Sequence, residues 1–272
     1  KSHVLSILFL LISVTLLAVP NDFRFRHFSV EDGLSSNSVR AIMQDKYGFL
    51  WIGTEEGLNR YDGIMIKSYS ICPQAAGKYI SSLYGTKKNI WIGTDEGIYI
   101  YAYATETFTY FDLTTPNNVR ITSIVNHILQ DKDGNLWFST NGQGLFRYNL
   151  SKNYLEQYEF TSAFGIVAST MADSDNQIWA LTNQGESGVY KLNKAENKFE
   201  PFGLLYNAGN HHSQALAMLE DSEQTLWLGT WECGLQKIDK YTRQTTTYLH
   251  PTDGKGVTHI HSLMEYAPHQ LL

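Results

Sequence analysis

The chain has 272 residues and a formal net charge of −6, with no long run of either sign. This balance argues against nucleic acid as a partner, because phosphate would meet an unfavourable field. Seventeen tyrosines and an aromatic share of 13% suit half-buried strands better than helices. Two cysteines are too few for a disulfide framework, and we expect Cys72 and Cys233 not to be bonded to each other.

The amino terminus has the composition of an export signal. Residues 4–19 are apolar except for two serines and one threonine, and Lys1 precedes them. Sixteen residues are short for a membrane span of about 20, so we predict that residues 1–20 form a signal peptide. Leu16 makes a poor cleavage site, which leaves an uncleaved anchor as the alternative. Residues 21–272 are predicted to form the exported domain.

Residues 23–28 alternate apolar and polar side chains, which is the period of a half-buried strand. The strand would stand alone before the first repeat of the chain. We expect it to complete the last blade of a ring, as orphan strands do in propellers. Residues 31–38 then form a turn-rich link.

The rest of the chain is a tandem repeat. Tryptophans at positions 51, 91, 137, 179 and 227 are 40, 46, 42 and 48 residues apart, close to the period of a four-stranded propeller blade. A threonine follows each tryptophan by three residues, and an aspartate precedes four of the five by six residues. The second copy departs from the aspartate rule with Gly85. A glycine followed by an aliphatic residue comes next in every copy, which indicates strand, tight turn and strand.

These registers predict an all-β β-propeller of four-stranded antiparallel blades. The five full blades cover about 39–69, 80–111, 124–158, 167–202 and 215–248, and a sixth begins at 259 with the strand-like residues 259–265. A propeller hides its strand edges by closing into a ring. We therefore interpret the chain as a fragment of a larger propeller array. The alternative is that residues 23–28 close onto the fifth blade.

Residues 44–61, with 30–35 before them and 61–63 after, resemble the two-component regulator propeller repeat. The resemblance extends from residue 23 to about 265 and is weakest in the fourth blade, where Ala180 and Leu181 replace Ile and Gly. It implies the periplasmic sensor region of a hybrid two-component histidine kinase from glycan-degrading gut bacteria. The membrane helix, kinase core, receiver and DNA-binding domain of that family are not in this sequence, so no catalytic residue transfers.

The resemblance implies a non-enzymatic sensor in the periplasm that binds an oligosaccharide or another small ligand. The remaining regions of such a protein would be its partners, and a homodimer stays possible. An exported propeller glycoside hydrolase or lyase is one alternative, and a protein-interaction scaffold is another. We find no nucleophile elbow, phosphate loop or zinc motif, and we expect no cofactor and no metal.

Several residues have a simple structural interpretation. The five repeat tryptophans are predicted to pack in the core. Residues 131–135 suggest a calcium loop, but the glycine is fourth and Gly142 occupies the twelfth position, so we predict a hairpin turn. The histidine pairs 211–212 and 259/261 lack a third ligand at a defined spacing. Trp231 falls outside the repeat register and is a candidate for exposure.

Binding residues are expected in the turns between the second and third strands and in the links between blades. Both emerge on one face, because strands alternate direction within a blade, and loops on a rigid scaffold commonly carry function. Sugar sites combine an aromatic platform with amides and carboxylates. The predicted ligand-binding residues are Asn141, Gln143, Asn183, Glu186, Tyr206, Asn210, His211, Trp231 and Glu232.

Overall fold

The computed structural model describes residues 25–72, 78–160, 165–182, 188–203, 215–231, 234–249, 259–268 and 270–272. The predicted signal peptide and Cys233 lie outside these residues. Within them we find no helix long and apolar enough to cross a membrane. The only helical turn in the described part is a 3-10 helix, Val30–Asp32, which Ser29 caps.

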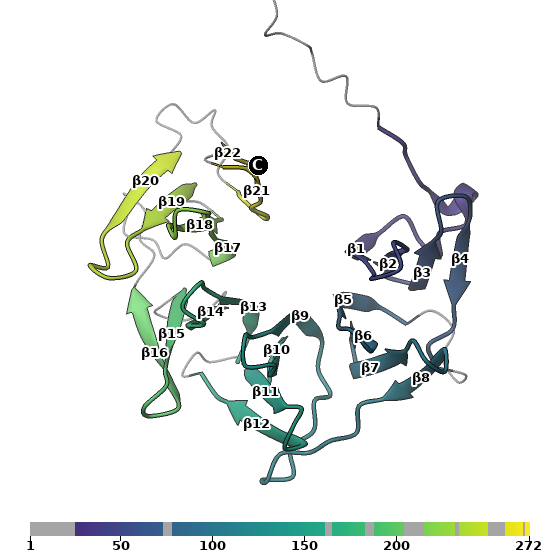
Figure 1. The fold of residues 1–272 in the computed structure, drawn as a ribbon, viewed down its shortest axis with the longest axis horizontal. Coiled ribbons are helices and arrows are strands. Elements are labelled where there is room, and N and C mark those ends of the chain that lie inside the picture. The colour runs from purple at the N-terminus through teal and green to yellow at the C-terminus, as the bar shows by residue number, and fades with distance from the viewer. Residues whose placement is uncertain are drawn as a thin grey trace, which may run out of the picture.

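Five separate antiparallel sheets follow one another along the chain, and each has four strands in sequence order (Figure 1). The strands of blade one are β1 (Val39–Gln44), β2 (Leu50–Thr54), β3 (Gly57–Tyr61) and β4 (Ile66–Tyr69). Those of blade two are β5 (Ile80–Gly85), β6 (Asn89–Thr94), β7 (Gly97–Ala102) and β8 (Thr107–Tyr110). Those of blade three are β9 (Val125–Gln130), β10 (Leu136–Thr140), β11 (Leu145–Asn149) and β12 (Tyr154–Tyr158).

The last two blades have the same plan. The strands of blade four are β13 (Val167–Ala172), β14 (Ile178–Thr182), β15 (Val189–Asn193) and β16 (Lys198–Gly203). Those of blade five are β17 (Ala215–Glu220), β18 (Leu226–Thr230), β19 (Leu235–Ile238) and β20 (Thr245–Leu249). A short hairpin of β21 (Glu265–Ala267) and β22 (Gln270–Leu271) follows. The blades stand around an open arc with the first strand of each on the inside (Figure 1), and the predicted propeller of four-stranded blades is confirmed.

The core lies between the blades, because each tryptophan packs against the blade that follows it. The ring of Trp51 lies 5.0 Å from that of Tyr101, and the ring of Trp91 lies 5.7 Å from that of Phe138. Trp137 and Trp179 are also buried, while Trp227 of the last full blade is half-buried. Burying aromatic rings of this size contributes much of the stability of such a core. The core assignment of the repeat tryptophans is therefore confirmed for the first four.

The aspartate of the repeat ties the first turn of a blade to its tryptophan. Asp131 Oδ2 accepts a hydrogen bond from Trp137 Nε1 at 2.8 Å, and Asp131 Oδ1 accepts one from the Asn135 backbone N–H at 2.8 Å. The same indole bond occurs in blades one, four and five at 2.8, 3.0 and 2.7 Å. The hairpin reading of residues 131–135 is thus confirmed, since the carboxylate is engaged by the turn itself.

Blade two shows what happens without the aspartate. Gly85 pairs with Ile90 as Gln44 pairs with Leu50 in blade one, so Thr86 occupies the position of Asp45 and the turn is one residue shorter. The Thr86 hydroxyl donates to the Asn89 carbonyl at 3.0 Å. The indole N–H of Trp91 is buried and has no partner among the described residues. A buried donor without a partner costs free energy.

The expectation that residues 23–28 form a closing strand is wrong for residues 25–28, which are described and are not a strand. Phe25 is 93% exposed. Arg26 donates to the Tyr61 hydroxyl at 2.8 Å, and the ring of Phe28 lies 4.8 Å from that of Tyr61. The segment therefore attaches to the end of β3 through side chains and not through a strand ladder.

Residues 259–265 take the place of an inner strand, although only their last two residues pair in a ladder with another segment. A Cβ at Gly229 would meet Ile260 at 2.7 Å, as one at Gly53 would meet Ile80 of the next blade at 2.5 Å. Glu265 accepts from the Ser222 hydroxyl at 2.7 Å, as Glu220 accepts from the Ser174 hydroxyl at 3.0 Å. The start of a sixth repeat is therefore at the predicted place. Residues 259–264 are not assigned as strand. Ladder pairing begins only at Met264, whose backbone exchanges two hydrogen bonds with that of Leu272.

The indole bond can be measured by a matched pair of substitutions. Trp137→Phe removes a donor from a buried carboxylate, whereas Trp91→Phe removes a donor that has no partner. We expect Trp137→Phe to lower the free energy of unfolding by roughly 1–3 kcal/mol more than Trp91→Phe. Urea unfolding followed by circular dichroism measures both variants. Equal losses in the two blades would contradict a stabilising role of the aspartate.

Candidate functional site

The structure describes three of the nine predicted ligand residues, Asn141, Gln143 and Trp231. The other six, Asn183, Glu186, Tyr206, Asn210, His211 and Glu232, lie outside the described residues.

Gln143 has a clear structural role. Its Oε1 accepts from the backbone N–H of Thr122 at 2.9 Å and of Ser123 at 3.0 Å, and its Nε2 donates to the Arg120 carbonyl at 3.0 Å. The amide therefore fastens the link that enters blade three to the turn after β10. Asn141 is exposed on the same turn.

Trp231 meets two histidines from the start of the sixth repeat. It is 41% exposed, as expected for a residue outside the repeat register. Its ring lies edge-on to His259 with centroids 4.1 Å apart and to His261 with centroids 5.6 Å apart. Among the described residues no group of three or more His, Cys, Asp or Glu side chains could hold a metal ion. The three rings form a partly exposed aromatic surface after β18.

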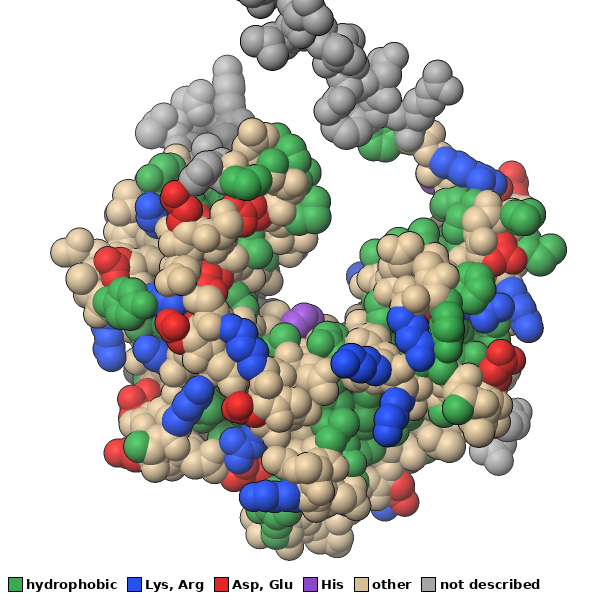
Figure 2. Space-filling view, in the orientation of Figure 1, with side chains coloured by type: hydrophobic (Ala, Val, Ile, Leu, Met, Phe, Trp, Pro, Cys, Tyr) green, Lys and Arg blue, Asp and Glu red, His purple; other side chains and the backbone are tan. Residues whose placement is uncertain are grey.

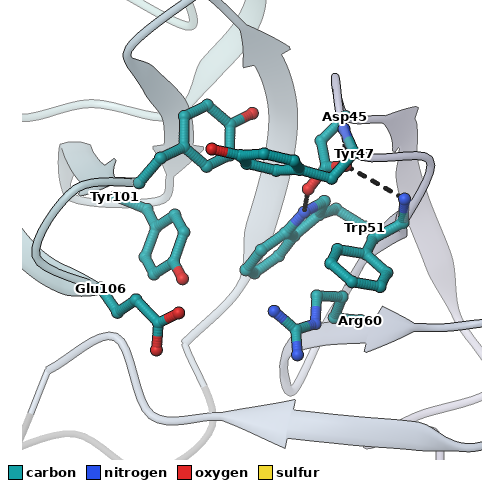
Figure 3. A pocket seen from close by; sticks show the side chains of 8 residues that line it. Asp45, Tyr47, Trp51, Arg60, Tyr101 and Glu106 are labelled. Atoms are coloured by element: carbon teal, nitrogen blue, oxygen red, sulfur yellow. Dashed lines mark hydrogen bonds between the residues drawn. The ribbon is translucent and has the colours of Figure 1, made fainter.

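A cavity of about 210 Å³ lies on the opposite face, between blades one and two (Figure 3). We call it the aromatic slot. The turn between β1 and β2 and the turn between β7 and β8 form its rim, and the ends of β3 and β7 form its sides. Its lining residues are Asp45, Tyr47, Phe49, Trp51, Arg60, Tyr101, Tyr103 and Glu106.

The walls of the slot are aromatic. The ring of Tyr103 stands edge-on to Tyr47 at 5.5 Å and to Tyr101 at 5.9 Å. Burial raises the pKa of the Tyr103 hydroxyl to about 12, and this buried hydroxyl has no hydrogen-bond partner among the described residues. Lys46 crosses the rim, since its Nζ donates to the Lys87 carbonyl at 2.7 Å and lies 4.7 Å from the centre of the Tyr103 ring.

Arg60 and Glu106 supply the charges of the slot, and Figure 3 shows both beside the aromatic rings. The Arg60 guanidinium lies 4.5 Å from the centre of the Phe49 ring and 5.8 Å from that of Trp51. Its Nε is buried without a hydrogen-bond partner in the described part of the chain. Glu106 is exposed and sits in the left-handed region with φ 54°. Asp45 is already engaged by Trp51.

The same place between blades three and four is filled by a polar network. Arg147 Nη2 lies 2.5 Å from Glu156 Oε2. The Tyr158 hydroxyl donates to the Glu156 carboxylate at 2.9 Å or to Asn197 Oδ1 at 2.7 Å, and Asn197 Nδ2 donates to Glu156 at 2.6 Å. Burial is the main cause that raises the pKa of the Tyr158 hydroxyl. The network links the two blades and gives the Arg147 guanidinium a carboxylate partner.

A second open cavity, of about 320 Å³, lies between blades four and five. Lys191 and Glu200, which pair across β15 and β16, both line it. Arg243 lies across the cavity with its guanidinium 5.3 Å from the centre of the Phe202 ring. Lys191 Nζ lies 5.2 Å from the centre of the Trp179 ring. In Figure 2, Lys and Arg side chains are interspersed with Asp and Glu rather than gathered in one patch.

A family model for the two component regulator propeller matches residues 33–56 and 119–142. These segments enter blades one and three and include β1, β2, β9 and β10. The chain contains two-component regulator propeller repeats. Each matched segment contains the repeat aspartate and the repeat tryptophan of its blade.

The relatives of the chain include a histidine kinase and an extracellular domain of a putative hybrid two component system. The chain is 46% identical over 68 residues to Histidine kinase P4 of Formosa agariphila, which is 25% of this chain and 5% of that protein. It is similar to the extracellular domain of BT3049 from B. thetaiotaomicron, which is assigned to the hybrid two component systems, with 25% identity and a TM-score of 0.68. That match covers 82% of this chain and 32% of the other.

Other solved propellers share the fold alone. The extracellular domain of BT4673 from B. thetaiotaomicron has 23% identity and a TM-score of 0.67, with 83% of this chain and 29% of the other covered. Virginiamycin B lyase from Staphylococcus aureus has 15% identity and a TM-score of 0.64, with 83% and 73% covered. The chain therefore spans about a third of the length of the BT3049 and BT4673 extracellular domains.

The aromatic slot was not singled out in the sequence. Its members come from two blades, and the residues that matter most, Arg60 and Glu106, look like ordinary surface charges on strand and turn. One signal was present: Arg60 follows its tryptophan by nine residues, and Arg147 follows Trp137 by ten. An alignment of the blades on their tryptophans would have shown a recurring cation.

The filled network gives a stability prediction. Glu156→Gln removes the carboxylate that pairs with the half-buried Arg147, and we expect it to lower the free energy of unfolding by roughly 1–3 kcal/mol. Lys67 occupies the equivalent position in blade one and is exposed, so Lys67→Gln should change stability by less than about 0.5 kcal/mol. Urea unfolding of both variants is the measurement. A loss for Lys67→Gln as large as that for Glu156→Gln would contradict the difference between the blades.

Proposed function

We propose that this propeller is a ligand-sensing input module of a two-component sensor. The observation that carries the proposal is the match of the regulator-propeller model to two blades of a chain that folds like the extracellular domain of BT3049. A sensing role also fits the scaffold. Rigid blades with variable turns can present binding residues without any change in the core.

The proposed ligand is a carbohydrate, and the proposed location is the periplasm. Trp231 with its two histidines offers a partly exposed aromatic surface of the kind on which a sugar ring packs. The export-signal composition of residues 1–20 and the extracellular origin of the BT3049 domain support the location. The proposed partners are the remaining propeller, membrane and kinase regions of such a sensor, and a second copy of the chain.

A propeller lyase is the second candidate, because the fold of virginiamycin B lyase superposes on most of this chain. That likeness concerns the fold alone, and function depends on the residues of the site rather than on the fold. Turnover of a glycan by the purified chain would support the lyase or hydrolase. Saturable binding of an oligosaccharide without turnover would support the sensor.

Trp231 gives the direct test of the proposed ligand face. The purified chain is screened against neutral oligosaccharides by thermal shift, and any binder is titrated by calorimetry. Trp231→Ala should weaken that binding about tenfold or more, while the melting temperature stays within a few degrees, since a partly exposed turn residue contributes little to the core.

The matched control is Tyr241→Ala, which removes another exposed aromatic ring from the turn between β19 and β20 on the opposite face. It should leave the affinity unchanged. Unchanged affinity for Trp231→Ala would remove Trp231 from the site, and equal losses for both variants would argue against a specific ligand face.

A further inference from the structure

A cation on the third strand faces the tryptophan of the second strand in four of the five blades. Arg60 is paired with Trp51 and Arg147 with Trp137, while Lys191 and Lys237 are paired with Trp179 and Trp227 in the same way. Each charged group lies within 6 Å of the indole ring that it faces. The cation and the indole therefore form a unit that recurs in four blades.

The residue across from this cation on the fourth strand is a carboxylate in two blades, and in blade three it forms an ion pair with the cation. Arg147 faces Glu156, and Lys191 faces Glu200. Arg60 instead faces Lys67, which is exposed. Blade one therefore places a second cation where two other blades place a carboxylate, so the internal partner of the arginine is replaced by a like charge.

No described residue supplies the missing carboxylate to Arg60. Its guanidinium forms no ion pair and no hydrogen bond within the described ranges. Glu106 lines the slot but is not within 4.0 Å of that guanidinium, and the equivalent turn residue of blade four, Asn197, is hydrogen-bonded to Glu156. A guanidinium held beside aromatic rings can bind a carboxylate through two parallel hydrogen bonds.

We propose that the aromatic slot binds the carboxylate of an acidic sugar ring, and that this carboxylate takes the place that Glu156 occupies in blade three. Arg60 and Lys67 neutralise the charge. The rings of Tyr47 and Phe49, which keep exposed surface in the slot, contact the sugar ring, and the Glu106 carboxylate binds its hydroxyl groups.

The size of the slot supports one small ring. Its volume of about 210 Å³ is below the range of about 300–1,000 Å³ that is typical of drug-sized ligand sites. The slot lies on the face opposite Trp231, so it is a second site. The inference that the ligand carries a carboxylate depends only on the charges of Arg60 and Lys67. The inference that the ligand is a sugar rests on the function proposed above.

Calorimetric titration of the full chain with sodium glucuronate tests the site, with glucose as the neutral match. Glucuronate should bind about tenfold or more tightly than glucose, because the carboxylate alone meets Arg60 and Lys67. Cyclohexanecarboxylate has the ring and the acid without the hydroxyl groups and should bind more weakly than glucuronate. Equal binding of glucose and glucuronate would overturn the site, and cyclohexanecarboxylate that binds as tightly as glucuronate would overturn the sugar assignment.

Two substitutions locate the binding. Arg60→Met keeps a long apolar side chain against Phe49 and should weaken glucuronate binding about tenfold or more. Lys67→Glu supplies the carboxylate found in blade three, so it should abolish the binding while the melting temperature is kept or raised. The Lys67→Glu variant keeps the proposal falsifiable if Arg60→Met fails to fold.

Lys237→Met is the matched control, since Lys237 stacks on its tryptophan but faces Thr246 and leaves no carboxylate unpaired. It should bind glucuronate as the unchanged chain does. Glucuronate affinity that Lys67→Glu does not alter would overturn the proposal. Loss of binding in the Trp231→Ala variant alone would place the ligand on the other face and contradict the slot.

Discussion

The carboxylate of one aspartate organises four of the five blades, because it holds the first turn and the indole of the repeat tryptophan at the same time. Asp173 accepts from the backbone N–H groups of Asp175 and Gln177 and from Trp179 Nε1. The hairpin and the contact with the next blade are thus fixed by the same side chain. Blade two folds to the same plan with Thr86 in that position, so the bond strengthens the repeat and does not by itself create it.

The repeat tryptophan is the same in every blade, whereas the residues near the surface of the blade differ from one blade to the next. Trp51 and Trp137 are both fully buried, yet the fourth-strand residue across from the neighbouring arginine is Lys67 in one blade and Glu156 in the other. The residue at this one position on the fourth strand therefore distinguishes a blade boundary that is filled by an ion pair from one that keeps a cavity. A repeat protein can vary its binding properties in this way while every blade keeps the same core.

The sequence was sufficient to predict the features that depend on residues near one another in the chain. The blade limits, the aspartate hairpins and the buried tryptophans follow from a local period, and they appear as predicted. Residues 25–28 were predicted wrongly because a strand needs a partner edge, which an alternating pattern cannot supply. The slot and the contact of Trp231 with His259 were not predictable, since their members meet only after blades have packed side by side.

Backbone ladders stop at every blade boundary, since each blade is its own sheet. Side chains such as Lys46, which reaches from blade one to the Lys87 carbonyl, make the connection between blades one and two around the aromatic slot. A ligand bound in the slot would act as an additional cross-link between the sheets of blades one and two. Ligand binding would then stiffen the boundary between these two blades without rearranging either sheet.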